Sequence, residues 1–278
     1  MRLGGPIYET FDTPEQWAQA NQKAGWRAVY CPLKPEADEA TCRAYAAAAE
    51  QAGLVIAEVG AWRNNTLSPD ETQRKQAIEN CAAHLALADR VGARCCVNIA
   101  GSRGEPWNGW HVDNFSRETF DLLVESLRAI IDTAAPARAA YGLEMKPWVF
   151  PDSAEQYLDL IDAVDRTAFC VHLDPVNIIS SPRRLYDNSR ILRHLLRTLG
   201  PHIRSIHVKD VTMSQKQLVH IDECRPGTGH LDLAMLLREA DRLPADMPLM
   251  MEHLPNAEEY ALAAEHLRGV ARQEGIAL

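Results

Sequence analysis

The chain has 278 residues, of which 46% are hydrophobic and 24% are charged, and its formal net charge at pH 7 is −9. This size and balance are typical of a soluble globular protein with a large core, and the negative charge disfavours nucleic acid as a partner, because proteins that grip a phosphate backbone carry basic surfaces. The sequence contains neither a run of about 18 apolar residues that would span a membrane nor a secretion signal at its start, so we expect a cytoplasmic protein with no membrane partner.

Short apolar segments alternate with longer helical patterns along the whole chain. Eight segments rich in Val, Ile, Cys and Ala are predicted to be strands: residues 3–8, 26–33, 54–62, 93–101, 142–148, 169–176, 203–210 and 248–255. The helical patterns between them are bounded by capping residues. Residues 13–25 begin with Thr-Pro and end with Gly, residues 68–92 begin with Ser-Pro and end with Gly, and a further helix is predicted after Asp152.

Eight strands and their helices match a (β/α)8 barrel of about 250 residues in number and order. A doubly wound open sheet is the main alternative, but the Gly-rich phosphate loop that usually follows its first strand is missing from the sequence GGPIYETFD. No linker with a shift in composition divides the chain. We therefore predict an α/β fold with one (β/α)8 TIM barrel domain over residues 1–278, and we expect the aromatic segment 103–116 to form a loop over the mouth of the barrel.

Ionisable residues stand at the ends of the last four predicted strands. They are Glu144 in LEMKPW, Asp174 in HLDP, His207 in HVKD and Glu252 in MEH. Because catalytic groups of this fold lie at the carboxyl ends of the strands, these side chains are expected to share one rim. Three neighbouring carboxylates would repel one another unless a cation lay among them. For any single residue a structural salt bridge is an equal alternative, but the four together predict a site for Mn²⁺, Mg²⁺ or Co²⁺.

The motifs of the second half of the chain resemble a known family. The run LExxPW, the HLDPxN stretch, the HxKD stretch followed by RPGTG, and the final MEH are similar to the xylose isomerase-like TIM barrel superfamily of sugar phosphate isomerases and epimerases. The tagatose and psicose 3-epimerases, hydroxypyruvate isomerase, inosose dehydratase and endonuclease IV also belong to that superfamily. The resemblance covers essentially the whole chain in order, and its specific motifs lie between Glu144 and Glu252.

The resemblance implies a metal-dependent isomerase or epimerase that acts on a keto-sugar or a sugar acid. It implies that Glu144, Asp174, His207 and Glu252 bind the metal, with Mn²⁺ expected and Mg²⁺, Co²⁺ or Zn²⁺ as alternatives. Glu144 and Glu252 would also form the catalytic pair that removes a proton beside a carbonyl and returns it to the other face, while the cation neutralises the enediolate. If only one of them reaches the carbon, the outcome would be isomerisation on one face or loss of a β-substituent.

A lyase or dehydratase is therefore the alternative function, similar to inosose dehydratase or to enzymes that cleave 3-keto-glycosides. In the ketose epimerases, the position three residues after the metal-binding aspartate is commonly a histidine that contacts substrate. Here it is Asn177, which we expect to be a substrate-binding residue at the same position, and the departure from histidine fits the lyase alternative.

Further residues are candidates for substrate contact. His172 shares a strand face with Asp174 and would either contact substrate or orient a ligand. Lys209 shares a face with His207 and would either hold a substrate oxygen or neutralise Asp210. Lys146 has the same two-residue spacing from Glu144, so it too is expected to point into the mouth.

Four other candidates are more distant from the predicted ligands in sequence. Arg225, before the PGTG element, is a candidate contact for an anion or a hydroxyl group. Trp148 would either stack on a sugar ring or only pack within its loop. Glu58, late in the third predicted strand, would line the cavity or hydrogen-bond a ligand, and His111 in the long loop is a candidate lid residue.

Two other functions are disfavoured. Repair of abasic DNA would need a trinuclear zinc site with extra histidines in the first strands and a basic face, and the first strands offer no such histidines. A non-catalytic barrel that had lost its metal would lack ligands, whereas all four are present. We therefore expect a small carbohydrate as the partner. Relatives in the superfamily are often dimers or tetramers, so a homo-oligomer is left open.

Overall fold

The computed structural model describes residues 1–278, and eight parallel strands in it form a closed barrel. The strands are β1 (Arg2–Gly4), β2 (Ala28–Tyr30), β3 (Val55–Gly60), β4 (Cys95–Asn98), β5 (Ala140–Glu144), β6 (Phe169–Leu173), β7 (Ile203–Val208) and β10 (Pro248–Met251). They follow chain order around the barrel, and β1 closes it by pairing with both β10 and β2. Each of the eight predicted segments overlaps one of these strands, so the predicted TIM barrel fold is confirmed.

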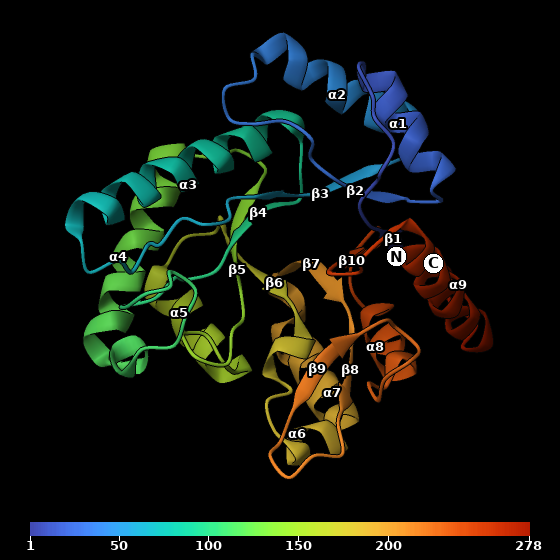
Figure 1. Ribbon diagram of the computed structural model, residues 1–278. Helices are drawn as coiled ribbons and strands as arrows, with labels where there is room; N and C mark the ends of the chain where they lie inside the picture. Colours follow the sequence, from blue (N-terminus) through green and yellow to red (C-terminus); the bar gives the residue numbers. More distant parts are fainter.

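Helices connect the strands and cover the outside of the barrel (Figure 1). They are α1 (Pro14–Lys23), α2 (Glu39–Gln51), α3 (Glu71–Val91), α4 (Arg117–Ala134), α5 (Ala154–Val164), α6 (Pro182–Tyr186), α7 (Asn188–Leu199), α8 (Leu233–Ala240) and α9 (Ala257–Gln273), with short 3₁₀ helices η1 (Val112–Phe115), η2 (Pro175–Ile178) and η3 (Gly200–His202). None of these helices combines the length and the hydropathy that crossing a lipid bilayer requires.

Capping residues explain most of the helix boundaries. Thr13 accepts a hydrogen bond from the Gln16 amide at the start of α1, as its sequence predicts. The predicted start of α3 at Ser68 is wrong: Asp70 is the cap, and its carboxylate accepts the first free amides of the helix. A carboxylate also interacts favourably with the positive end of the helix dipole, and Ser68 instead accepts a hydrogen bond from the Asp70 amide.

The packing of α5 against the barrel fixes two strands that end at the predicted site. Tyr157 is fully buried, and its hydroxyl lies 2.8 Å from the carbonyl oxygen of Leu143 and 2.9 Å from that of Cys170. The same hydroxyl accepts the Leu143 amide hydrogen at 3.0 Å. One helix side chain therefore joins β5 to β6 just before Glu144 and Asp174.

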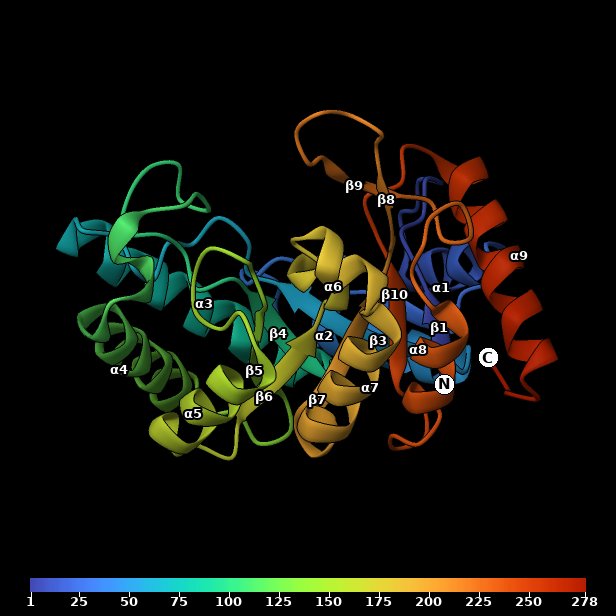
Figure 2. The same ribbon diagram turned by 90° about the horizontal axis from the view of Figure 1, so that it is seen from below.

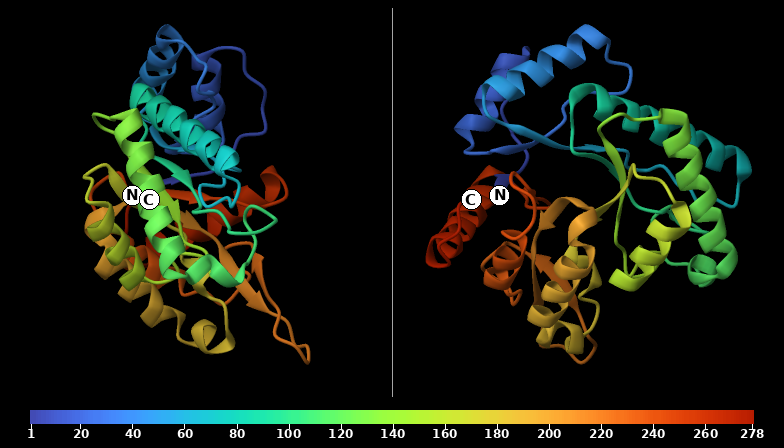
Figure 3. Two further views of the ribbon diagram at one scale, coloured as in Figure 1. Left: turned by 90° about the vertical axis from the view of Figure 1, so that its left-hand side faces the viewer. Right: turned by 180° about the vertical axis from the view of Figure 1, so that it is seen from behind.

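A two-stranded antiparallel hairpin, β8 (Asp210–Met213) with β9 (Ile221–Cys224), follows β7 and was not predicted. The predicted strand 203–210 ends at Val208, and Asp210 already belongs to the hairpin. Figure 2 shows the hairpin standing above the barrel, and the left view of Figure 3 shows it on the same side as the segment after β4. This segment includes the predicted loop 103–116, which contains the short helix η1.

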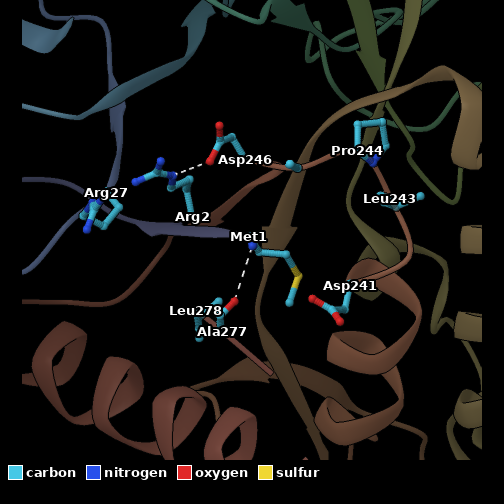
Figure 4. Close-up of a pocket in the computed structure, with 10 residues that line it drawn as sticks. Met1, Arg2, Arg27, Asp241, Leu243, Pro244, Asp246, Ala277 and Leu278 are labelled. Atoms are coloured by element: carbon cyan, nitrogen blue, oxygen red, sulfur yellow. Dashed lines mark hydrogen bonds and ion pairs between the residues drawn. The ribbon is translucent and has the colours of Figure 1, made fainter. Parts of the chain in front are cut away.

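The opposite end of the barrel holds a different cavity, about 460 Å³ in volume, at the beginnings of β1 and β2 and before β10 (Figure 4). Arg2 pairs there with Asp246 at 2.6 Å, and the amino terminus donates to the carbonyl oxygen of Ala277 at 3.4 Å. The amino ends of TIM barrel strands serve stability, and catalytic sites lie at the carboxyl ends. These contacts tie the two ends of the chain to each other.

Candidate active site

The four ionisable residues predicted at the strand ends converge on one point, and we call Glu144, Asp174, His207 and Glu252 the rim cluster. Glu144 is the last residue of β5, Asp174 follows β6, His207 is the second-last residue of β7, and Glu252 follows β10. One donor atom of each lies within 4.8 Å of those of the others. Glu144, Asp174 and His207 are buried, and Glu252 is partly exposed at the mouth.

The imidazole of His207 faces the three carboxylates of the rim cluster. Its Nδ1 lies 3.0 Å from Glu252, 3.8 Å from Glu144 and 3.9 Å from Asp174, yet this buried atom makes no hydrogen bond. Burial disfavours the charged imidazolium, but Glu252 and Glu58 outweigh it and raise the pKa of His207 well above its usual value. A cation among the carboxylates would take over this neutralisation and leave Nδ1 as a ligand, so the donor set fits a divalent metal.

A second layer of polar residues lies beneath the rim cluster, inside the barrel. The carboxylate of Glu58, in β3, accepts hydrogen bonds from Nε2 of His207 at 3.0 Å, from Nε2 of His172 at 2.9 Å and from the hydroxyl of Ser205 at 3.1 Å. Burial raises the pKa of Glu58, but the two histidines outweigh it and hold the pKa well below its usual range. Of the two predicted residues, Glu58 therefore holds Nε2 of His207, and His172 forms its hydrogen bond with Glu58 rather than with the rim cluster.

Lys209 brings a positive charge to the rim cluster. Its ammonium lies 2.6 Å from Asp174, 2.7 Å from Glu252 and 2.9 Å from Glu223, and the side chain is only 2% exposed. Burial lowers its pKa, but these carboxylates outweigh it and raise the pKa above the usual value. The alternative in which Lys209 neutralises Asp210 is wrong, because the Asp210 carboxylate instead accepts the backbone N–H groups of Val211, Gly227, Gly229 and Leu231.

Two more predicted residues contact the rim cluster directly. The Lys146 ammonium pairs with Glu144. The side-chain amide of Asn177, in η2, donates to Glu144 at 2.6 Å and to Asp174 at 2.8 Å. Burial raises the pKa of Glu144, but the charges of Lys146 and His207 outweigh burial and hold this pKa below its usual value. For Asp174, burial outweighs the charge of Lys209, and the pKa is raised.

The remaining candidates lie farther out. Trp148 borders a cleft beside Asn177, and its buried Nε1 has no hydrogen-bond partner. Arg225 follows β9 and pairs with Glu259 of α9 at 2.8 Å, and the structure gives it no contact with the rim cluster. His111 accepts the Asp113 amide hydrogen at the start of η1 and likewise has no contact with the cluster.

Sequence analysis missed Glu223, which reaches the site from the hairpin. Glu223 accepts hydrogen bonds from Lys209 and, at 2.7 Å, from Nδ1 of His253. Burial raises the pKa of Glu223, but the hydrogen bond from His253 and the Lys209 charge lower it to about 2. Residues 210–213 and 221–224 are separated by residues 214–220, which begin with the polar run SQKQ. Two short segments separated by a polar run are the sequence signal that could have predicted a hairpin here.

Comparisons with known proteins agree with this architecture. A family model described as xylose isomerase-like TIM barrel matches residues 18–270. D-psicose 3-epimerase from Clostridium cellulolyticum H10, solved with D-tagatose, superposes with a TM-score of 0.68 at 16% identity, over 97% of this chain and 99% of that one. A 3-keto-D-glucoside 4-epimerase from E. coli gives 0.71 at 16% identity, with 97% and 99% covered.

Endonuclease IV from Thermus thermophilus gives a TM-score of 0.72 at 16% identity, over 98% of this chain and all 100% of that one. No curated protein matches the chain in sequence. At these identities the likeness to solved structures establishes a shared fold, and the chemistry has to be argued from the site.

Proposed function

Because the chain belongs to the xylose isomerase-like TIM barrel family, we propose that it is a divalent-metal-dependent isomerase or epimerase of a keto-sugar or sugar acid. The observation that carries this proposal is the rim cluster, in which three carboxylates and one imidazole nitrogen lie within 4.8 Å of one another. Structural likeness to enzymes named as epimerases of D-psicose and a 3-keto-D-glucoside supports a carbohydrate substrate. The net charge of −9 favours a small carbohydrate over a nucleic acid.

The metal would be held by the carboxylates of Glu144, Asp174 and Glu252 and by Nδ1 of His207. A donor set of three oxygens and one nitrogen suits Mn²⁺ or Mg²⁺. When bound, such a cation would polarise a substrate carbonyl and stabilise the negative charge that develops as a neighbouring proton leaves. Glu58 holds Nε2 of His207 and so keeps the opposite nitrogen directed at the carboxylates.

Glu144 and Glu252 are proposed as the proton-transfer pair. They come from β5 and β10, which β6 and β7 separate in the barrel, so the two carboxylates would approach a substrate carbon from different sides. Burial raises the pKa of Glu252, but His207 and Lys209 outweigh it and hold the pKa well below its usual range. Both groups are therefore ionised near neutral pH. One would accept the substrate proton and later release it to solvent, while the other would first take up a proton from solvent and then deliver it to the opposite face of the carbon.

The positively charged side chains would assist this transfer. Lys146 hydrogen-bonds Glu144 and Lys209 hydrogen-bonds Glu252, so each carboxylate of the pair has its own ammonium group. These lysines would hold the carboxylates in place and donate hydrogen bonds to substrate oxygens. The barrel wall that buries Glu144 and His207 would exclude water from the reacting carbon.

The experiment that tests this function uses the protein with Mn²⁺ in D₂O and a panel of keto-sugars, sugar acids and keto-glycosides. We expect deuterium to enter a carbon beside the carbonyl, as followed by NMR, and EDTA to abolish the exchange. The product separates the alternatives, because an epimer or isomer supports the proposal and an eliminated β-substituent supports the lyase alternative. A metal-loaded protein that exchanges no proton on any of these substrates contradicts both.

A further inference from the structure

We propose that the substrate is a neutral glycoside whose second sugar unit lies in a cleft beside the rim cluster. This inference rests on the proposed function and names its substrate class. The cleft, which we call the hairpin cleft, lies between residues 147–148 after β5, residues 176–180 after β6, and the β8–β9 hairpin at residues 211–223. Its volume of about 370 Å³ lies within the range of small-ligand pockets, about 300–1,000 Å³.

Two residues that line the hairpin cleft also form hydrogen bonds at the candidate site. Asn177 lines the cleft and donates hydrogen bonds to Glu144 and Asp174. Glu223 lines the opposite wall and accepts a hydrogen bond from Lys209, which itself contacts Glu252. The hairpin cleft therefore borders the rim cluster, and we place the second sugar unit of the substrate in it.

The lining of the hairpin cleft suits a neutral sugar unit. Trp148 presents an aromatic side chain next to Ile179 and Ile221, and these surfaces match the C–H face of a pyranose ring. The carboxylates of Asp222 and Glu223 accept hydrogen bonds from hydroxyl groups.

The charge of the hairpin cleft excludes an anionic substituent. Two carboxylates line it, whereas no lysine, arginine or histidine does. A phosphate or carboxylate group placed there would face like charges with no donor cation, so a phosphorylated sugar does not fit.

The hairpin supplies a matched pair of residues for the test. Val219 lines the hairpin cleft and is 58% exposed, whereas its neighbour Leu218 is 74% exposed and does not line it. Val219→Arg and Val219→Trp would both fill the cleft, one with and one without added charge. Leu218→Arg adds the same charge to the same hairpin outside the cleft and serves as the control.

The experiment measures binding of unreactive sugar alcohols to the Mn²⁺-loaded protein by calorimetry. The probes are sorbitol, sorbitol 6-phosphate, and two glucosyl-sorbitols linked through oxygen 4 or oxygen 6. We expect at least one glucosyl-sorbitol to bind about tenfold or more tighter than sorbitol, and the phosphate to bind no tighter than sorbitol. Both Val219 variants should lose this preference, and Leu218→Arg should keep it.

Because the probes have no carbonyl group, they cannot react, and their binding tests the glycoside inference independently of the proposed proton transfer. Any of three results would overturn the glycoside inference. Sorbitol and both glucosyl-sorbitols could bind equally well, sorbitol 6-phosphate could bind most tightly, or Val219→Arg and Leu218→Arg could lose the preference for glucosyl-sorbitol to the same extent. Absence of deuterium exchange with every keto-sugar and keto-glycoside, alongside a clear preference for a glucosyl-sorbitol, would instead overturn the proposed function and leave the cleft as a sugar-binding site.

Discussion

Oε1 of Glu58 lies 3.0 Å from Nε2 of His207, inside the barrel and on the side of the imidazole ring opposite the rim cluster. The two residues are 149 positions apart in the chain and come from strands β3 and β7, which are not neighbours in the barrel. A carboxylate in this place fixes the orientation of the ring and raises the basicity of the other nitrogen. In the proposed metal site, Glu58 would therefore prepare Nδ1 to bind the cation without contacting the cation itself.

We expect Glu58→Gln to weaken Mn²⁺ binding by about 10- to 100-fold, because the neutral amide no longer raises the basicity of the opposite ring nitrogen, Nδ1 of His207. Titration of the metal-free protein with Mn²⁺, followed by calorimetry, measures the change. Ser205→Ala is the control, since it removes a hydrogen bond to the other oxygen of Glu58 and leaves the contact with His207 in place. Equal affinity in Glu58→Gln and the native protein would exclude this orienting role.

Glu144→Gln and Glu252→Gln should each slow proton exchange by a factor of about 10² or more, because an amide cannot accept the proton. The side chains keep their shape, so circular dichroism and the folded state should be unchanged. Glu265→Gln, at an exposed position of α9, is a control that makes the same chemical change far from the rim cluster and from the hairpin cleft. Full exchange in either glutamine variant would remove that residue from the catalytic pair.

Asp174→Asn should lower the metal content of the purified protein, because it removes one of three anionic donors while the Lys209 ammonium stays in place. Elemental analysis after dialysis against a limiting Mn²⁺ concentration measures the effect. The native protein should in addition gain about 2.7 kcal/mol of unfolding free energy when Mn²⁺ is present at about 100 times its dissociation constant. If Asp174→Asn retains the native metal content and the same stabilisation, Asp174 is not a ligand.

Tyr157→Phe should destabilise the fold by about 1–3 kcal/mol, because the buried backbone groups of β5 and β6 lose their shared hydroxyl partner. Urea unfolding of the metal-free protein measures this without a contribution from the cation. Tyr186→Phe makes the same chemical change at a side chain that is 77% exposed, and it should alter stability by less than about 0.5 kcal/mol. Equal stability of the two variants would show that the hydroxyl of Tyr157 does not join the strands.

The sequence by itself determined the barrel and the positions of the rim cluster. Strand periodicity and capping residues act over short distances along the chain, so the eight strands and most helix ends could be predicted locally. The last residues of parallel strands meet at one edge of a barrel, which is why Glu144, Asp174, His207 and Glu252 could be expected together from the sequence alone.

Only the tertiary structure decided what surrounds those four residues. The contact between Glu58 and His207 crosses the barrel, and the approach of Glu223 to Lys209 depends on a hairpin that folds back over the rim. Neither contact follows from local spacing, because each depends on how the closed barrel places strands that are distant in sequence. The partners of Lys209 show the same point: its neighbour Asp210 satisfies the backbone of the RPGTG segment, while Lys209 itself points inward to Asp174 and Glu252.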